Sequence, residues 1–230
     1  MVIQKWHPVT HDFGLINAPL RRVVEDLQRW HVGIGIKYQC TELTSSLEET
    51  LRRLLPLSNS KERRLFFQTD SDWVACYQNG IQGSDPFPAM SMLVRRLGVM
   101  AMRVCSTESP WPAQIWEVYA PEALGGKPPV GHRRAISVLN DGGRWVFEQS
   151  GEPFPFEQIE AYAAPRKKDR FGRQQLLAYL SRFAIRPFED SFLRVSADAP
   201  AVLLQQITKL SSLPKFTLEE VIKGVPWRHG

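Results

Sequence analysis

No stretch of the 230-residue chain approaches the roughly 18 to 20 consecutive apolar residues that a membrane-spanning helix requires. The segment from Met1 to Pro8 also lacks a continuous apolar run after its basic residue, unlike a secretory signal peptide. We therefore expect a cytoplasmic protein without a membrane partner.

Cysteine is scarce: Cys40, Cys76 and Cys105 lie far apart, and no Cys-x-x-Cys pair exists. Each belongs to or borders an apolar run, which is typical of reduced, buried thiols. This spacing does not fit a zinc site, so we expect no metal. His7 and His11 are four residues apart, but the proline that follows His7 favours a loop over a helix that would present both rings to one ion.

Motifs of catalysis and of nucleotide binding are also missing. Neither Gly-x-Ser-x-Gly nor Gly-x-x-x-x-Gly-Lys-Ser/Thr occurs in the chain. Two Ser-x-x-Lys matches, beginning at Ser58 and Ser212, lack the companion motifs that would make them meaningful. We therefore expect no cofactor, and the sequence favours a non-enzymatic protein.

The clearest positive signal is a β-hairpin in the middle of the chain. Strands are predicted at 135–139 and 144–149, because both are rich in apolar and β-branched residues and flank the turn sequence Asn-Asp-Gly-Gly. Alternation places Trp145 and Phe147 on one face of the second strand and the charged residues on the other. The prolines at 153 and 155 predict a sharp corner, followed by a helix from about Phe156.

A similar arrangement occurs earlier in the chain. Predicted strands at 65–68 and 73–78 are followed by Pro86-Phe87-Pro88 and a helix that ends at Gly98. Two hairpin–helix units suggest an internal repeat, with similar halves at about 1–108 and 109–230. Coincidence is the alternative, since tryptophan, glycine and proline recur wherever strands turn.

The second unit also resembles a known protein family. The letters DGGRWVFE at 141–148 and SGEPFPFE at 150–157 are similar to a segment of a family of uncharacterised bacterial proteins. The resemblance covers the middle of the chain, and it implies no activity and no catalytic residue.

The remaining pattern supports a single α+β domain over residues 1–230, with an antiparallel or mixed sheet and helices packed on it. An apolar content of 43% and a charged content of 23% are ordinary for a globular protein. Further strands are predicted at 34–40, 99–105 and 114–119. Residues 6–15 are expected to be irregular. Further helices are predicted after Asn17, after Ser45 with Glu48 completing a capping box, and after the basic run near Arg173. Two more are predicted after Pro200, with Leu203, Ile207 and Leu210 on one side, and after Thr217 with Glu220 completing a second capping box.

Glu117 and Glu148 are the candidate catalytic pair. Both lie in the middle of predicted strands, so if these strands are neighbours the two acids line one sheet face, as an acid–base pair in a hydrolase requires. The alternative is a structural ion pair for each acid, with an arginine such as Arg134 or Arg144 as the partner.

A basic segment is the candidate site for nucleic acid. From Arg166 to Arg186 the chain has seven basic residues and one acidic residue, while the total charge is +5. Within 166–173, the basic side chains can contact phosphates and Phe171 can stack on a base. Such a run is also typical of a solvated helix entrance.

We expect the chain to be a protein-binding domain of the immunity or adaptor kind, with another protein as its partner. Seven tryptophans can supply interface anchors. The candidate binding residues are Arg144, Trp145, Glu152, Arg166, Lys167, Lys168, Arg170 and Arg173.

Overall fold

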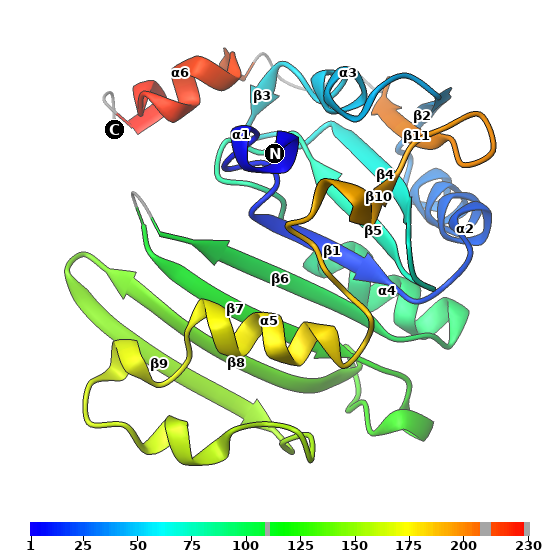
Figure 1. Cartoon of the computed structure of the whole chain (residues 1–230). Coiled ribbons are helices and arrows are strands. Elements are labelled where there is room, and N and C mark those ends of the chain that lie inside the picture. Colours follow the sequence, from blue (N-terminus) through cyan, green and yellow to red (C-terminus); the bar gives the residue numbers. More distant parts are fainter. Residues whose placement is uncertain (109–110, 208–212, 228–230) are drawn as a thin grey trace.

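The computed structural model describes residues 1–108, 111–207 and 213–227. Its centre is a ten-stranded antiparallel sheet with the strand order β2-β11-β4-β5-β1-β6-β7-β8-β9, in which β10 pairs with β4 (Figure 1). The expected α+β class is therefore confirmed. The strands of this sheet are β1 (Asp12–Ile16), β2 (Tyr38–Leu43), β4 (Arg63–Thr69), β5 (Val74–Gln78), β6 (Ala101–Thr107), β7 (Ala113–Tyr119), β8 (His132–Asp141), β9 (Arg144–Gly151), β10 (Leu193–Arg194) and β11 (Ala201–Gln206). A small second sheet pairs β3 (Leu57–Ser58) with β12 (Lys215–Phe216).

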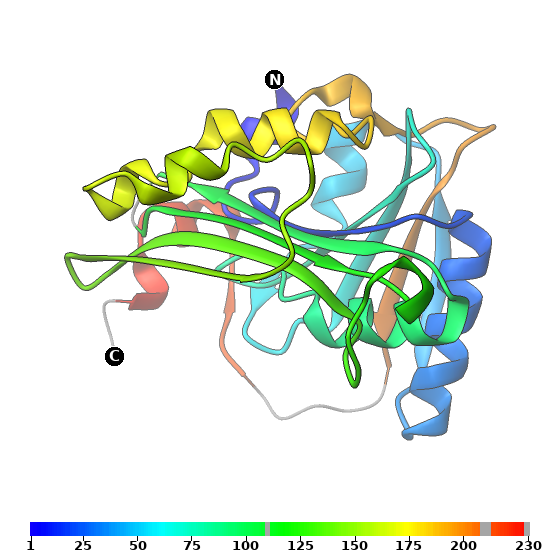
Figure 2. The ribbon, with the colours of Figure 1, turned by 90° about the horizontal axis from the view of Figure 1, so that it is seen from below.

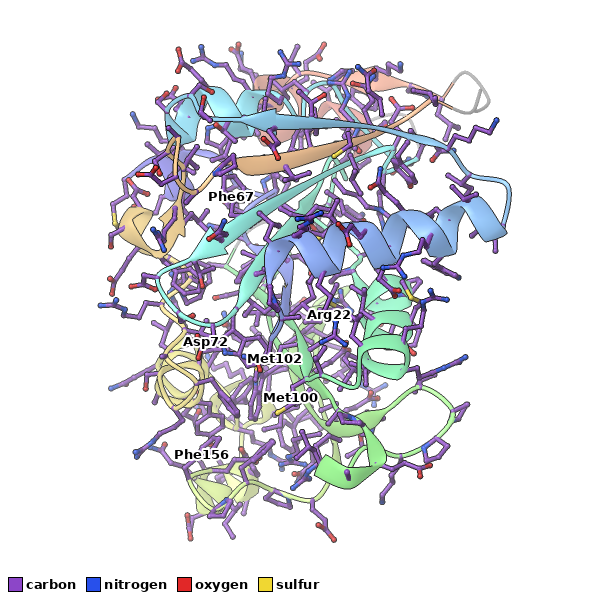
Figure 3. All side chains as sticks on the ribbon, turned by 90° about the vertical axis from the view of Figure 1, so that its right-hand side faces the viewer. Arg22, Phe67, Asp72, Met100, Met102 and Phe156 are labelled. Carbon is purple, nitrogen blue, oxygen red and sulfur yellow. The ribbon has the colours of Figure 1, made fainter. Side chains whose placement is uncertain are left out.

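Helices lie on both faces of the large sheet, and Figure 3 shows these layers edge-on. The α-helices are α1 (Val2–Lys5), α2 (Leu20–Gly33), α3 (Leu47–Arg52), α4 (Phe87–Leu97), α5 (Arg173–Ser181) and α6 (Leu218–Ile222). Short 3-10 helices are η1 (Glu122–Leu124), η2 (Ile159–Ala163), η3 (Lys167–Asp169), η4 (Asp190–Phe192) and η5 (Val225–Trp227). We call the side that carries α1, α3 and α5 the α5 face, and the side that carries α2 and α4 the α4 face.

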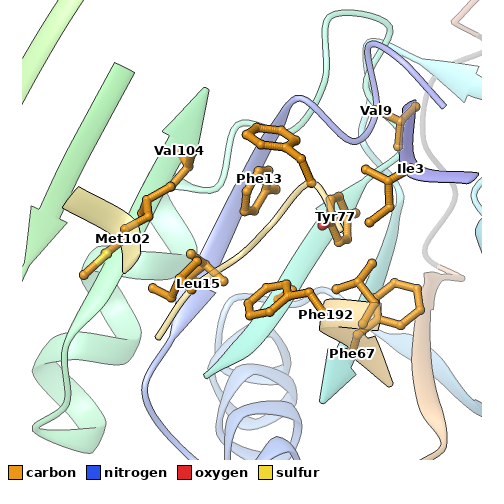
Figure 4. Close-up of a cluster of buried hydrophobic side chains, with 14 of the residues drawn as sticks. Ile3, Val9, Phe13, Leu15, Phe67, Tyr77, Met102, Val104 and Phe192 are labelled. Atoms are coloured by element: carbon orange, nitrogen blue, oxygen red, sulfur yellow. The ribbon is translucent and has the colours of Figure 1, made fainter. Parts of the chain in front are cut away.

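The larger core lies on the α5 face. Side chains alternate along each strand, so Phe13, Phe67 and Tyr77 from three strands meet there at 0% exposure (Figure 4). Trp116 on β7 extends this core beneath α5, where its ring lies 5.5 Å from that of Tyr179. A smaller core on the α4 face lies under α2 and α4.

The predicted central hairpin is confirmed. Asp141 pairs with Arg144 across a two-residue turn, and Gly142 and Gly143 take the positive φ angles of +57° and +91° that the turn requires. The Asn140 carboxamide oxygen accepts a hydrogen bond from the Gly143 amide at 2.8 Å. Both strands are longer than predicted, because pairing continues to Gly151.

The two hairpin units end differently. The first leads into α4, as predicted, and Gly98 ends that helix with a φ of +66°. After the second hairpin the expected helix from Phe156 does not form; η2 occurs instead, on the α5 face. The structure therefore gives no support to an internal repeat.

Residues after Pro200 form a strand, so the predicted helix is wrong there. The segment Ala201–Gln206 is β11, which pairs with β2 on one side and β4 on the other. Its first four residues are buried, because one side of the strand faces each core. The predicted helix also included Leu210, which lies outside the described residues.

Several boundaries also differ from the predictions. Trp6 to Leu15 was expected to be irregular, yet β1 lies there at the centre of the sheet. α2 begins after Pro19 rather than at Asn17. The first capping box uses Ser46 and Glu49, one residue later than expected, whereas the box at Thr217 is confirmed. Cys76 and Cys105 are buried free thiols, but Cys40 on the edge strand β2 is exposed.

Candidate functional site

Half of the α4 face has no covering helix in the described part of the chain. α4 packs on β1, β6 and the end of β7, and α2 packs on β4. Figure 2 shows α5 on one side of the sheet and α2 and α4 on the opposite side. On that opposite side, α2 and α4 lie toward the β2 end of the strand order, away from β8 and β9. We call the uncovered area the open face; its residues are Ile115, Glu117, Ala135, Ser137, Val146, Glu148 and Ser150.

The structure places both candidate acids on the open face, but on strands that are not neighbours. Glu117 on β7 is opposite Ala135, and Glu148 on β9 is opposite Ser137, so β8 lies between them. Two strand spacings and two residues along the strand separate the backbones by about 12 Å. The Glu117 carboxylate is further held away from β9, because it accepts a 2.7 Å hydrogen bond from the Tyr119 hydroxyl.

A ladder of charges runs from Glu117 toward the centre of the sheet. The Arg103 guanidinium on β6 lies 3.7 Å from Glu117 and donates two hydrogen bonds to the Asp12 carboxylate, at 2.9 and 3.3 Å. Burial nevertheless raises the pKa of Asp12 to about 6, because desolvation outweighs the hydrogen bonds and charge of Arg103. Glu117 thus has an arginine partner, as the ion-pair alternative expected, although that partner is Arg103.

A cavity of about 750 Å³ lies at the strand ends beneath α6, and its lining includes neither acid of the candidate pair. Its lining includes His11, Asp12 and Cys105. Burial, His7 and Arg173 lower the pKa of His11 to about 4, so this imidazole is neutral at pH 7. Burial also raises the pKa of the Cys105 thiol, which keeps it protonated and weakly nucleophilic. This cavity is therefore poorly equipped for nucleophilic catalysis.

One buried ion pair joins two segments of the fold. Arg134 and Glu157 have side-chain exposures of 1% and 0%, and their closest atoms are 2.7 Å apart. Arg134 also donates to the backbone carbonyls of Ser150 and Gly151, while Glu157 accepts from the Tyr162 hydroxyl. The pair ties β8 to the corner that follows β9, and both groups are fully hydrogen-bonded, as buried charges require.

The candidate binding residues of β9 are spread along the strand. Arg144 is exposed at the turn, and Glu152 is exposed just beyond the opposite end. Trp145 is partly buried against the core of the α5 face. These three residues therefore do not form one contiguous site.

Most of the basic run is engaged in local contacts. Arg166 pairs with Asp169, Arg170 donates to a backbone carbonyl and lies over the Phe147 ring, and Arg173 donates to the Ser106 hydroxyl. Phe171 is 0% exposed, so it is not accessible for stacking on a base. Lys167 and Lys168 are exposed on η3, and Arg166 remains largely solvated beside them.

Within the described ranges, no group of three or more His, Cys, Asp and Glu residues is placed to hold a metal ion. No helix of that same part of the chain has the length and hydropathy to cross a bilayer.

Sequence reasoning missed Asp12 and Arg103. Both belong to the centre of the sheet, but Asp12 was assigned to an irregular segment. The alternation of Phe13 and Leu15 with Gly14 was the available signal, and it was short because β1 has only five residues. Arg103 sits among apolar residues of β6, a position where a charged side chain needs a partner.

Comparison with known proteins supplies no functional residue for this surface. Over the whole chain, no protein-family model, no curated protein and no solved structure matches.

Proposed function

We propose that the chain is a non-enzymatic protein-binding domain, of the immunity or adaptor kind, and that its open face receives the partner. The observation that carries the proposal is the distribution of residue types on this face. Its apolar side chains, Ile115, Ala135 and Val146, lie around the uncharged Ser137 on β8, while Glu117 and Glu148 lie on its two outer strands. An uncharged middle with charged residues toward the outside is the usual anatomy of a protein interface.

The shape of the open face also favours a macromolecular partner. It contains a hollow of about 510 Å³ over β7, β8 and β9 that is about half open to solvent. Small-molecule sites instead enclose most of their ligand in a deep, largely apolar pocket. The exposed Glu148 favours a partner that places lysine or arginine beside an apolar patch.

The tryptophans support the proposal less than the sequence suggested. Trp6, Trp73 and Trp116 are at most 5% exposed and belong to the core. Trp111 is 45% exposed, but it lines the large cavity rather than the open face. The open face and not the tryptophan content is therefore the basis of the proposal.

The test is a pull-down of the tagged chain from its native host at moderate salt, with mass spectrometry to quantify proteins retained in fixed ratio. Wild type is compared with Ile115→Arg, which places a charge among the apolar side chains of the open face. We expect this substitution to weaken a contact there by at least about tenfold. The captured protein is then purified and its affinity for both chains is measured directly.

A second variant, Lys167→Glu/Lys168→Glu, is the matched control, because it alters the exposed part of the basic run and leaves the open face unchanged. The proposal holds if one purified partner binds wild type and this control equally and binds Ile115→Arg weakly. It is overturned if no protein is retained, if Ile115→Arg binds as wild type does, or if only the lysine variant loses binding. Retention of nucleic acid that weakens steeply with salt supports the basic run instead.

A further inference from the structure

Strand β9 is the last strand of the large sheet, and its outer edge has no strand partner in the described residues. η3 lies against both β8 and β9, and none of the backbone hydrogen bonds among the described residues joins it to the outer edge of β9. Glu148, Gln149 and Ser150 are all exposed. An edge of this kind presents unpaired amide and carbonyl groups to another strand.

The hairpin geometry shows which backbone groups point outward. The two-residue turn makes Asp141 and Arg144 a hydrogen-bonded pair, and such pairs alternate along an antiparallel ladder. The amides and carbonyls of Trp145, Phe147 and Gln149 therefore point away from β8. They form an unpaired ladder along the free edge of β9.

We propose that two copies of the chain pair antiparallel through β9, about a two-fold axis that passes beside Val146. In this register Trp145 of one copy forms the hydrogen-bonded pair with Phe147 of the other, and this pairing occurs twice. Identical edge strands that pair in this way form a closed, symmetric interface.

Charge complementarity selects both the partner and the register. Arg144 and Glu148 lie four residues apart on the same face of β9. The axis at Val146 therefore places Arg144 of each copy opposite Glu148 of the other. Directly opposed side chains of opposite charge stabilise antiparallel pairs, and like charges destabilise them. If the two-fold axis passed beside Glu148 instead of Val146, Glu148 of one copy would lie opposite Glu148 of the other. The like charges disfavour that register.

The other edge of the sheet has no such complementarity. β2 has the sequence YQCTEL, in which Glu42 is the only charged residue. No antiparallel register of β2 with itself brings opposite charges together. Charged residues on an edge usually prevent pairing, but on β9 their signs and spacing favour one self-pairing.

The dimer brings the two open faces to the same side, because the two-fold axis is normal to the sheet. The inference stands independently of the proposed protein partner, since it concerns the edge of β9 rather than the centre of the open face. Ile115, the residue that tests the partner, lies two strands away on β7.

The test is sedimentation velocity of the full chain over roughly a hundredfold range of concentration. Wild type should show a reversible increase toward the dimer mass. Arg144→Glu and Glu148→Arg should each raise the dimer dissociation constant by at least about tenfold, since each creates two like-charge pairs. An equimolar mixture of the two variants should form a heterodimer, because every opposed pair in it has opposite charges.

Glu152→Arg is the matched control, because it makes the same charge change outside the paired segment. Circular dichroism and thermal melts establish that all variants keep the fold, as expected for exposed side chains. The inference is overturned if wild type stays monomeric at every concentration, or if the two variants mixed together behave as each does alone. It is also overturned if Glu152→Arg weakens the dimer as much as Glu148→Arg does.

Discussion

At the scale of single residues, His31 illustrates how burial selects a protonation state. The ring is 1% exposed, and Nδ1 lies 2.7 Å from the Leu27 carbonyl while Nε2 lies 2.9 Å from the Arg64 guanidinium. Since the guanidinium only donates, Nε2 accepts and Nδ1 carries the proton. Burial and the Arg64 charge lower the pKa of His31 to about 4.

Stability should therefore depend on pH through this residue. The folded pKa of His31 lies below the ordinary value of 6.5, so its stabilising contribution is complete above pH 6.5 and is lost as the pH falls toward 4. We expect His31→Gln, which cannot be protonated, to lose less thermal stability than wild type between pH 6.5 and 4.5. Thermal melts across this range measure the difference, and parallel curves for the two proteins would contradict the expectation.

Asp12 acts in the opposite direction over the same range. Its pKa is raised to about 6, so its contribution favours the folded state at low pH and is lost as the pH rises through 6. The contribution of Asp12 to the pH dependence cancels when His31→Gln is compared with wild type, because both proteins retain Asp12.

At the scale of elements, the conformation of the corner after β9 is set by contacts of Arg134 and Glu157. The helix expected from Phe156 has no part in it, because it does not form. Gly151 permits the turn: its φ is +80°, and a Cβ atom there would lie 2.2 Å from the Arg133 carbonyl oxygen. Glu157 accepts hydrogen bonds from Arg134 and from the Phe154 amide. These contacts hold residues 154–157 in place, and the chain continues as a 3-10 helix.

Glu157→Gln should destabilise the protein strongly. The substitution leaves the buried Arg134 charge without its counter-charge, and loss of one partner of a buried pair costs about 3 to 5 kcal/mol. Urea denaturation followed by circular dichroism measures the loss. Glu25→Gln is the control, since Glu25 pairs with Arg21 on the surface of α2 and should leave the urea midpoint unchanged. Equal midpoints for Glu157→Gln and wild type would show that the buried pair is dispensable.

At the scale of the whole molecule, the C-terminal part of the chain returns to complete the first part of the sheet. β11 lies between β2 and β4, although more than 130 residues separate it from β4 in the sequence. Its side chains Val202 and Leu204 contribute to the smaller core and Leu203 to the larger one. The two halves that the sequence suggested therefore share a single sheet.

Truncation should show this dependence. A chain that ends at Pro200 lacks β11 and should not unfold cooperatively in urea, because both β2 and β4 lose a strand partner. A chain that ends at Ile207 keeps β11 and loses α6 and β12, and we expect it to retain a cooperative transition. If both truncated chains unfold as wild type does, β11 is not required for the fold.

The central hairpin, α4 and the capping box of α6 followed from local sequence, because glycine turns, helix caps and alternating apolar residues act over a few residues. The candidate site was only partly predictable. Alternation placed Glu117 and Glu148 in strands, but whether those strands were neighbours depended on the strand order. That order arises from contacts between distant segments, which no local pattern encodes.

The amino-acid sequence by itself determined the α+β class, the hairpin signals and the membership of Glu117 and Glu148 in strands, since each depends on short-range chemistry. Only the tertiary structure decided that Ala201–Gln206 is a strand, that Arg103 joins Asp12 and Glu117, and that half of the α4 face is uncovered. The physical reason is burial on both sides of β11. A short segment that begins with four apolar residues suits a helix or a strand, and its neighbours in space select the strand.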